Sequence, residues 1–241
     1  MPKFFADKTN IGEEKIIIDG SDAVHIGRSL RMRLGDEITV CCDGREYECE
    51  ILTISDTAVE CRILSAGDGV NEADIRLTLF QAMPKSDKLE FIVQKAVELG
   101  AYRICPVMTS RCVSRPDAKG FKKKLDRLNK IALEAAKQCG RSIVPLVTEI
   151  ISFDECLDEM AQMDKAVICY EKGGRNLKEI GFEKNQSIGV FIGSEGGFDE
   201  EEAQKCICAG ITPIGLGRRI LRCETAPIAA ISIIMNITDN M

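Results

Sequence analysis

A glycine-rich loop near the end of the chain is the first candidate for chemistry. Residues 188–192 have the unbroken apolar character of a buried strand, and Gly193-Ser194-Glu195-Gly196-Gly197-Phe198-Asp199 follows them directly. Ligands of open α/β sheets bind outside the carboxyl ends of strands, and glycines let the backbone approach a ligand closely. The Glu195 carboxylate would repel a phosphate, so the loop favours a cationic or hydroxyl-bearing ligand such as a sulfonium or a ribose. A tight strand-to-helix connection explains the glycines equally well.

A second loop concentrates arginine. It reads Ile214-Gly215-Leu216-Gly217-Arg218-Arg219-Ile220-Leu221-Arg222-Cys223-Glu224-Thr225-Ala226-Pro227, and an apolar run over residues 228–237 follows. Glu224 lies where the next helix should begin, and an acid there suits the helix dipole. Three arginines within five positions exceed what a simple connection needs. Leu216, Ile220 and Leu221 either form the wall of a pocket or belong to the core.

Positive charge is concentrated in one segment of an acidic chain. The formal net charge is −6, yet residues 103–142 contain eleven Lys and Arg against three acidic residues, so this segment carries +8 and the remainder −14. A compact basic block on an acidic protein is typical of a contact with a polyanion. The alternative is a basic helix face exposed to solvent.

Cysteine and histidine usage excludes other chemistries. The twelve Cys form no C-x-x-C pair and His25 is the only histidine, which argues against a bound metal. Ser-His and Cys-His catalysis would depend entirely on His25.

The sequence contains no stretch that approaches the roughly 20 apolar residues of a membrane span, and charged residues occur among the first eight positions. We therefore expect a cytoplasmic protein with reduced thiols and no membrane contact.

The elements that position these residues fall into two domains. Residues 1–68 contain short alternating apolar runs separated by turns at Gly35-Asp36 and Asp43-Gly44, with one helical stretch over residues 22–33. This pattern is typical of a small antiparallel barrel. The small residues between Ser65 and Gly69 lack a strand pattern, so we place the domain boundary there.

From residue 72 to residue 241 strands alternate with helices, which predicts an α/β domain with a largely parallel sheet. Three pairs spaced as capping boxes, Asp87 with Glu90, Ser152 with Glu155, and Asp199 with Glu202, mark helix starts. The apolar runs predict strands over residues 75–83, 102–108, 166–169 and 188–192, and helices over residues 88–99, 118–139 and 228–237.

Taken together, the motifs resemble those of a known family. Four segments carry the resemblance: the loops G-S-E-G-G-F-D-x-x-E and L-G-x-R-I-L-R-x-E-T-A, H-I-G-R-S-L-R at residues 25–31, and Q-K-A-V-E-L-G at residues 94–100. They resemble the motifs of the RsmE family of 16S rRNA uridine-N3 methyltransferases, which belongs to the SPOUT superfamily. The chain departs from the family pattern at Lys3, Ser194 and Cys223, where arginine, proline and threonine are usual. The resemblance implies a PUA-like RNA-binding β-barrel followed by a SPOUT domain with a deep trefoil knot.

The same resemblance implies a cofactor and its site. S-adenosylmethionine would be held in the knot, and methylation of uridine N3 would need help as the base loses its proton. We assign to Arg222 the stabilisation of charge developing on the uracil oxygens, and regard Glu224 as the weaker candidate for a general base. The cofactor contacts carried over are Ile192, Gly193, Glu195, Gly196, Leu216, Gly217, Ile220, Leu221 and Thr225.

The partners implied are 16S rRNA in the small ribosomal subunit and a second copy of the chain. SPOUT enzymes build their sites at a two-fold interface, so we expect a homodimer that buries part of the apolar helix over residues 228–237. The RNA contacts expected are His25, Arg28, Arg31, Arg111, Arg115, Lys122, Lys123, Arg127, Gln138 and Arg141.

Three alternatives stay open at this point. The chain could be a SPOUT enzyme that methylates another position, such as a ribose 2′-hydroxyl, or a non-catalytic RNA-binding or ribosome-assembly factor. A nicotinamide-dependent oxidoreductase is disfavoured, because the glycine-rich loop lacks the G-x-G-x-x-G fingerprint.

Overall fold

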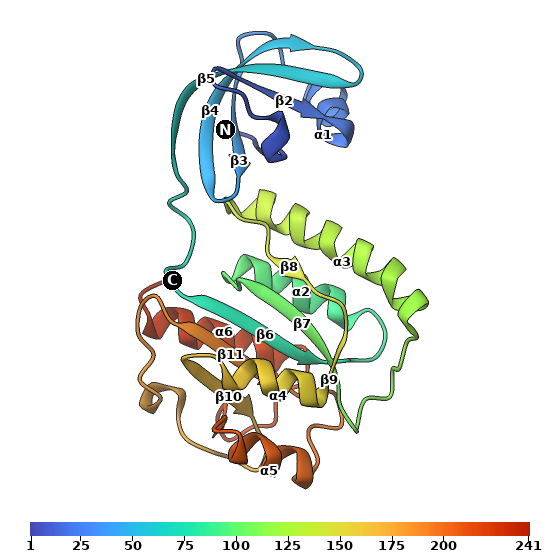
Figure 1. Ribbon diagram of the computed structural model, residues 1–241, viewed down its shortest axis with the longest axis vertical. Helices are drawn as coiled ribbons and strands as arrows, with labels where there is room; N and C mark the ends of the chain where they lie inside the picture. Colours follow the sequence, from blue (N-terminus) through green and yellow to red (C-terminus); the bar gives the residue numbers. More distant parts are fainter. The chain divides into compact units, whose positions relative to one another are not determined.

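The computed structural model describes residues 1–241, apart from the side chain of Ala118, and shows two compact units (Figure 1). The N-terminal unit comprises Met1–Glu72 together with Ala136–Ile143. The C-terminal unit comprises Ala73–Ala135 and Val144–Met241.

The N-terminal unit is a curled β-sheet in the strand order β1-β3-β4-β5-β2. Alternation determines its inner face: in β2, Ile16 and Ile18 are buried while Ile17 between them is exposed. The pairs are antiparallel as predicted, except that β1 runs parallel to β3. The strands are β1 (Lys3–Phe5), β2 (Lys15–Asp19), β3 (Glu37–Cys42), β4 (Arg45–Ile54) and β5 (Ala58–Asp68).

The helical stretch of this unit is shorter than predicted. The sequence predicts it over residues 22–33, whereas the structure has α1 (Gly20–Val24) followed by one π-helical segment, η2 (His25–Ser29). Arg31 has φ +53°, a left-handed conformation that a helix cannot include, so the helix ends before it. A short 3₁₀ turn, η1 (Lys8–Asn10), precedes β2.

The interpretation of residues 65–69 as a turn without strand character is wrong. β5 continues to Asp68 because its backbone stays paired with β4, with Gly67 opposite Glu46 and Asp68 opposite Arg45. Ladder hydrogen bonds come from the backbone, so small side chains do not end a strand when a long partner lies beside it.

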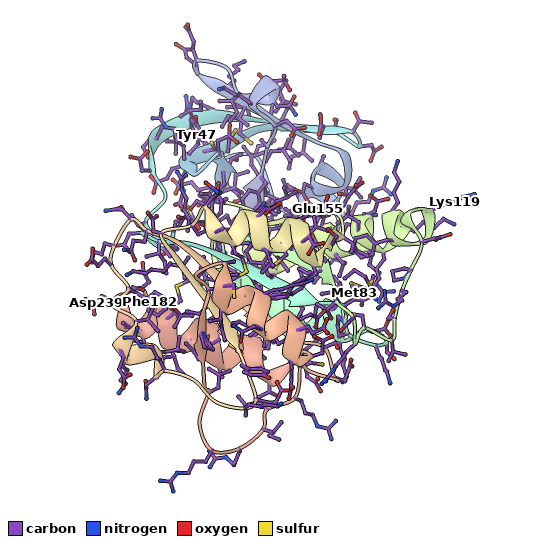
Figure 2. The ribbon with its side chains drawn as sticks, turned by 60° about the horizontal axis from the view of Figure 1, so that its bottom comes forward. Tyr47, Met83, Lys119, Glu155, Phe182 and Asp239 are labelled. Carbon is purple, nitrogen blue, oxygen red and sulfur yellow. The ribbon has the colours of Figure 1, made fainter. Side chains whose placement is uncertain are left out.

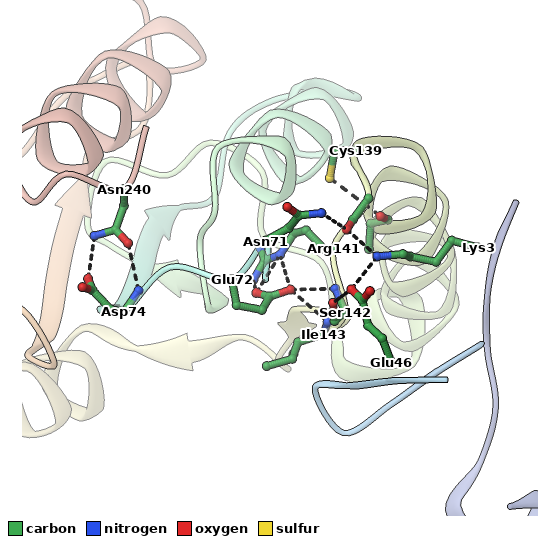
Figure 3. A network of polar contacts seen from close by, with 12 residues as sticks. Lys3, Glu46, Asn71, Glu72, Asp74, Cys139, Arg141, Ser142, Ile143 and Asn240 are labelled. Carbon is green, nitrogen blue, oxygen red and sulfur yellow. Dashed lines mark hydrogen bonds and ion pairs between the residues drawn. The ribbon is translucent and has the colours of Figure 1, made fainter. Parts of the chain in front are cut away.

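The segment Ala136–Ile143 joins the N-terminal unit through a network of polar contacts (Figure 3). The Glu72 carboxylate accepts hydrogen bonds from Arg141 Nη2 at 2.6 Å and from the backbone N–H groups of Ser142 and Ile143 at 2.8 and 3.0 Å. Lys3 Nζ donates to the Gly140 carbonyl oxygen at 2.7 Å. Sequence reasoning gives this segment to the second domain, because it lies far from residues 1–68 along the chain.

The C-terminal unit is a parallel sheet in the order β12-β10-β11-β6-β7-β8, with β9 also paired to β7. The parallel pairing of β6, β7, β10 and β11 and the burial of most of their residues agree with the apolar runs that predict these four strands, whereas β8, β9 and β12 are short strands that the sequence does not predict. The strands are β6 (Arg76–Ala82), β7 (Arg103–Met108), β8 (Leu146–Val147), β9 (Ile151–Ser152), β10 (Lys165–Cys169), β11 (Ser187–Ile192) and β12 (Thr212–Ile214).

Helices cover this sheet, with α4 in front of it and α6 behind it in Figure 1. On one face Phe153 at the start of α4 packs on Phe191 of β11, whose ring also meets Phe198 edge-on at 4.7 Å between centroids. α6 packs on α2 and on strands β6 and β11. The helices are α2 (Lys88–Glu98), α3 (Ala118–Cys139), α4 (Phe153–Ala161), η3 (Leu177–Glu179), α5 (Glu200–Cys208) and α6 (Thr225–Ile237).

Helix boundaries follow local sequence signals in most cases. The capping boxes of Ser152 and Asp199 are both formed. Asp87 occupies the N-cap position of α2 but makes no side-chain capping bond in the part of the chain described, so that predicted box is wrong. Among the described residues, no helix is long and apolar enough to cross a membrane.

Strand order places the functional loops. β6 lies between β11 and β7 in the sheet, and all three run in the same direction. Their carboxyl ends therefore share one edge, which brings the segments after β6, β7 and β11 close together.

Candidate active site

A cavity of about 520 Å³ opens at this edge of the C-terminal unit. Its wall comes from two segments: the first loop, residues 193–199 after β11, and the second loop, residues 215–224 after β12. Lys88 and the residues after β10 complete it. The predicted cofactor residues that line the cavity are Ile192, Gly193, Glu195, Gly196, Leu216, Gly217, Ile220 and Leu221. Thr225 is not among the lining residues, although its neighbour Ala226 is.

The first loop is a tight turn whose glycines are required by close packing. A Cβ on Gly193 would lie 3.0 Å from the Gly197 Cα, and Gly197 itself has φ +64° with the Glu171 carboxylate 2.8 Å from where its Cβ would be. Bulkier residues at either position would force the turn open. The glycines therefore set the shape of the cavity wall.

A lysine links the two loops. Lys88, the first residue of α2, places its Nζ 2.9 Å from Glu195 Oε1 in the first loop and 3.1 Å from Glu224 Oε2 at the end of the second. The backbone N–H of Lys85 adds a 3.1 Å hydrogen bond to Glu195. Sequence reasoning missed this residue.

Both carboxylates are ionised in this arrangement. Partial burial of Glu195 acts to raise its pKa, but the hydrogen bonds from Lys88 and from backbone N–H groups outweigh it and lower the pKa below its ordinary value. Glu224 behaves in the same way: burial acts to raise its pKa, while bonds from Cys223 and Lys88 bring the net shift downward. The two carboxylates in turn raise the pKa of Lys88, so its ammonium stays charged.

Cys223 forms a hydrogen bond with its neighbour Glu224. The thiol donates to Glu224 Oε2 at 3.1 Å and is buried. Burial, together with this hydrogen bond, raises the pKa of Cys223 to about 12, so the group remains a protonated donor. The hydroxyl of a threonine at this position could donate to the same carboxylate, so the departure from the family pattern keeps the contact.

The second loop is largely exposed. Ile220 is 85% exposed, which excludes it from the core, while Leu216 and Leu221 are half-buried at the cavity. Arg222 is exposed and lines the cavity, and its carbonyl oxygen accepts the N–H groups of Thr225 and Ala226 at 2.9 Å as α6 begins.

A third segment, between β7 and α3, braces the first loop. Arg111 Nη1 donates to the Gly196 carbonyl oxygen at 2.9 Å, and Ser110 Oγ donates to Asp199 Oδ2 at 2.6 Å. The Ser110 bond leads the effects that lower the pKa of Asp199. Arg115 folds back on its own segment and donates to the carbonyl oxygens of Thr109 and Cys112.

Comparison with known proteins identifies the family. An RNA methyltransferase domain model matches residues 71–235, and an RNA methyltransferase PUA domain model matches residues 18–64. The ribosomal RNA small subunit methyltransferase E of Bacillus subtilis is 36% identical over 99% of this chain and 98% of its own. The chain belongs to the ribosomal RNA small subunit methyltransferase E family.

Two solved structures that contain S-adenosylmethionine share the fold. The Neisseria gonorrhoeae enzyme bound to S-adenosylmethionine is 32% identical and superposes with a TM-score of 0.88 over 99% of this chain and 98% of that one. A Legionella pneumophila methyltransferase, also with bound S-adenosylmethionine, gives 0.88 at 27% identity over 98% of each chain.

The cavity of this family member fits such a cofactor. Its volume lies within the roughly 300–1,000 Å³ of small-molecule sites. Among its lining residues the cations Lys88, Arg218, Arg219 and Arg222 outnumber the carboxylates Glu171 and Glu195, which suits the carboxylate of the cofactor, and Leu216 and Leu221 offer apolar surface. Gln81 is fully buried beneath the first loop, where its Nε2 donates to the Gly193 carbonyl oxygen at 3.3 Å. Its Oε1 has no partner among the described atoms.

The predicted RNA contacts fall into two groups. Those with exposed side chains are His25, Arg28 and Arg31 in the N-terminal unit and Lys122, Lys123, Arg127 and Gln138 on α3. Figure 2 shows Lys119 near the start of α3 with its side chain directed into solvent. The second group consists of Arg111 and Arg115, which are exposed but donate to backbone carbonyl oxygens of their own unit, and Arg141, which pairs with Glu72. Arg141 is only 4% exposed, because the Glu72 carboxylate holds it.

One signal in the sequence points toward Lys88. It follows the end of β6 by six residues, and ligand sites form at strand ends. The order of strands in the sheet, which makes β6 a neighbour of β11, is not contained in any local pattern.

Proposed function

We propose that this protein transfers a methyl group from S-adenosylmethionine to N3 of a decoding-region uridine in 16S rRNA of the small ribosomal subunit. The observation that carries the proposal is the cavity, because both family loops converge on it from separate strands. Full-length similarity to ribosomal RNA small subunit methyltransferases E supports the substrate.

The chemistry divides between the cofactor and the chain. Bound S-adenosylmethionine supplies an electrophilic methyl group, and residues of the two loops hold and orient it; we further infer that the chain around them is tied in a trefoil knot. Arg222, exposed at the cavity, stabilises negative charge on the uracil oxygens as N3 loses its proton. Glu224 is a weak base because its pKa is lowered, so its role is to accept the bonds of Lys88 and Cys223.

The role of Arg222 is tested by separating turnover from cofactor binding. Arg222→Ala should lower kcat by about 100-fold, the effect of removing one donor to a developing oxyanion. The affinity for S-adenosylhomocysteine should stay unchanged, because the arginine acts on the base. Normal turnover in this variant would remove Arg222 from the mechanism.

RNA phosphates contact the exposed basic residues in this proposal. Lys119, Lys122, Lys123 and Arg127 present charge along α3, and His25, Arg28 and Arg31 present it in the N-terminal unit. We leave Arg141 out of this surface because it is buried against Glu72, and Arg111 and Arg115 because their guanidinium groups bind backbone carbonyl oxygens. Arg28 and Arg127 stay in the surface because their side chains remain largely exposed although they pair with Asp56 and Glu90.

A homodimer belongs to the same proposal. Phe91 on α2 and Ile233 on α6 are 46% and 36% exposed on two helices that pack together, and a second copy would cover them. Sedimentation at micromolar concentration should give twice the 26.5 kDa mass of the chain. A single-chain mass would refute the dimer.

The function is tested with purified protein, labelled S-adenosylmethionine and small ribosomal subunits that lack the modification. Label recovered as 3-methyluridine on nucleoside analysis is the expected result. Label in another nucleoside would overturn the proposed position and favour a SPOUT enzyme with a different target. Absence of cofactor binding would favour a non-catalytic assembly factor.

A further inference from the structure

Lys88 is the point at which the two cofactor loops meet. Its Nζ has three hydrogens to donate. The acceptors around it are Glu195 Oε1 at 2.9 Å, Glu224 Oε2 at 3.1 Å and Cys223 Sγ at 3.7 Å. One acceptor belongs to the first loop and two to the second, so a single ammonium binds both walls of the cavity.

We propose that Lys88 is a positioning residue that ties the first loop to the second and thereby fixes the cavity in its cofactor-binding shape. The inference rests on the proposed function, since it concerns the same cavity. It assigns a role to a residue outside both family loops.

The second loop depends on this tie because of how its ends are held. At one end the Gly215 N–H donates to the Arg175 carbonyl oxygen at 3.2 Å. At the other end Glu224 is bound by Lys88. The residues between are mostly exposed, with Ile220 at 85%. Exposed backbone with few buried contacts opens readily, so its conformation is controlled from its ends.

The charges of Glu195 and Glu224 explain why the residue that links the two loops must be a cation. Glu195 and Glu224 both approach the same ammonium, and both are ionised. Without a positive charge between them, the two carboxylates would repel each other and push the loops apart. With it, the three groups sum to one negative charge. The side chains of all three are between 22% and 29% exposed, so solvent screens the interaction only in part.

A merely structural lysine on the same helix provides the matched control. Lys95 on α2 pairs with Glu98 at 2.8 Å and has a side chain 33% exposed, similar to the 29% of Lys88. It does not line the cavity. Lys95→Met therefore removes an ion pair of similar exposure from the same helix without touching either loop.

The test measures binding of S-adenosylhomocysteine by calorimetry, which requires no turnover. We expect Lys88→Met to weaken binding about tenfold, the scale of a charge-assisted hydrogen bond. Amide hydrogen exchange over residues 215–223 should accelerate in the same variant. Lys88→Arg should restore most of the affinity, and Lys95→Met should leave both measurements unchanged.

A double-mutant cycle gives a second reading of the same tie. If Lys88 acts through Glu224, the loss of affinity in the double variant should be smaller than the product of the fold-losses caused by Lys88→Met and Glu224→Gln alone. The double variant should bind S-adenosylhomocysteine about as well as the single variant with the lower affinity. Glu224→Gln also tests the contact between Lys88 and the second loop if the Lys88→Met variant does not fold. This substitution alone should accelerate amide hydrogen exchange over residues 215–223.

The outcomes separate this inference from the proposed function. If the wild-type protein does not bind S-adenosylhomocysteine, the proposed function fails. If the wild type binds but Lys88→Met binds equally well, or if the two effects multiply, the positioning role of Lys88 is refuted while the proposed function stands.

Discussion

Arg111 donates a hydrogen bond from its guanidinium to the carbonyl oxygen of Gly196, over 2.9 Å and 85 positions of sequence. The segment before the basic helix α3 is thus hydrogen-bonded to the first loop, which lines the cavity. The charge pattern of the sequence predicts a phosphate contact for this arginine. The geometry indicates a bond to the protein's own backbone.

Arg111→Ala should therefore act on the cofactor. Losing this exposed bond should weaken S-adenosylhomocysteine binding about fivefold, on the order of 1 kcal/mol. The salt dependence of RNA binding should stay the same, because no phosphate contact is lost. A variant with normal cofactor affinity but a shallower salt slope would show the opposite assignment to be correct.

Arg141→Ala should act on stability. Removal of this buried guanidinium leaves the Glu72 carboxylate without its charge partner, which should lower the free energy of unfolding by about 3 kcal/mol. Arg28→Ala is the control, because Arg28 and Asp56 form an exposed pair worth at most about 1 kcal/mol. Urea unfolding followed by circular dichroism distinguishes the two. Equal losses would contradict a structural role for Arg141.

Lys122 and Lys123 should govern the salt dependence of RNA binding. Each phosphate contact with a single strand contributes about 0.7 to the slope of log affinity against log salt, so replacing both with alanine should reduce the slope by about 1.4. Lys205→Ala, an exposed change on α5, should not alter it. Filter binding of a small-subunit rRNA fragment between 50 and 300 mM salt, about the range in which such contacts respond, measures it. An unchanged slope would place the RNA elsewhere.

The Lys88 tie should be insensitive to pH over a wide range. Glu195 and Glu224 have pKa values below the ordinary 4.5, so their contribution is complete above pH 4.5 and is lost only as the pH falls through the lowered values. Lys88 has a pKa raised above 10.5, so its contribution is complete below pH 10.5 and is lost only above that. S-adenosylhomocysteine affinity, measured by calorimetry between pH 5 and 9, should stay level. A transition inside this window would show that another group controls the cavity.

Much of this molecule could be predicted from local patterns. The α3 helix begins and ends at the predicted residues, Ala118 and Cys139, because its apolar stripe and Gly140 act within a few turns of one another. The capping boxes at Ser152 and Asp199 are equally local. Burial and charge patterns along one segment decide such features, and neither needs knowledge of the rest of the chain.

Features that depend on pairings between distant segments were missed. Lys88 meets Glu195 across 107 positions because β6 lies beside β11, and strand order leaves no local trace. The side chains after Ser65 lack a strand pattern and predict a turn, whereas pairing with β4 keeps these residues in a strand. The net charge of a segment likewise cannot distinguish an arginine that faces solvent from one, like Arg141, that is paired inside.

The contacts of Glu72 have a consequence for synthesis of the chain. The last strand of the N-terminal unit is complete at Asp68, but this unit also includes Ala136–Ile143. Ser142, which donates to Glu46, and the residues that bind Glu72 are therefore translated later. Until residue 143 has left the ribosome, these carboxylates and the Lys3 ammonium lack Ser142, Arg141 and the Gly140 carbonyl oxygen. The N-terminal unit, although synthesised first, therefore completes its polar contacts only after the segment that follows α3 has emerged.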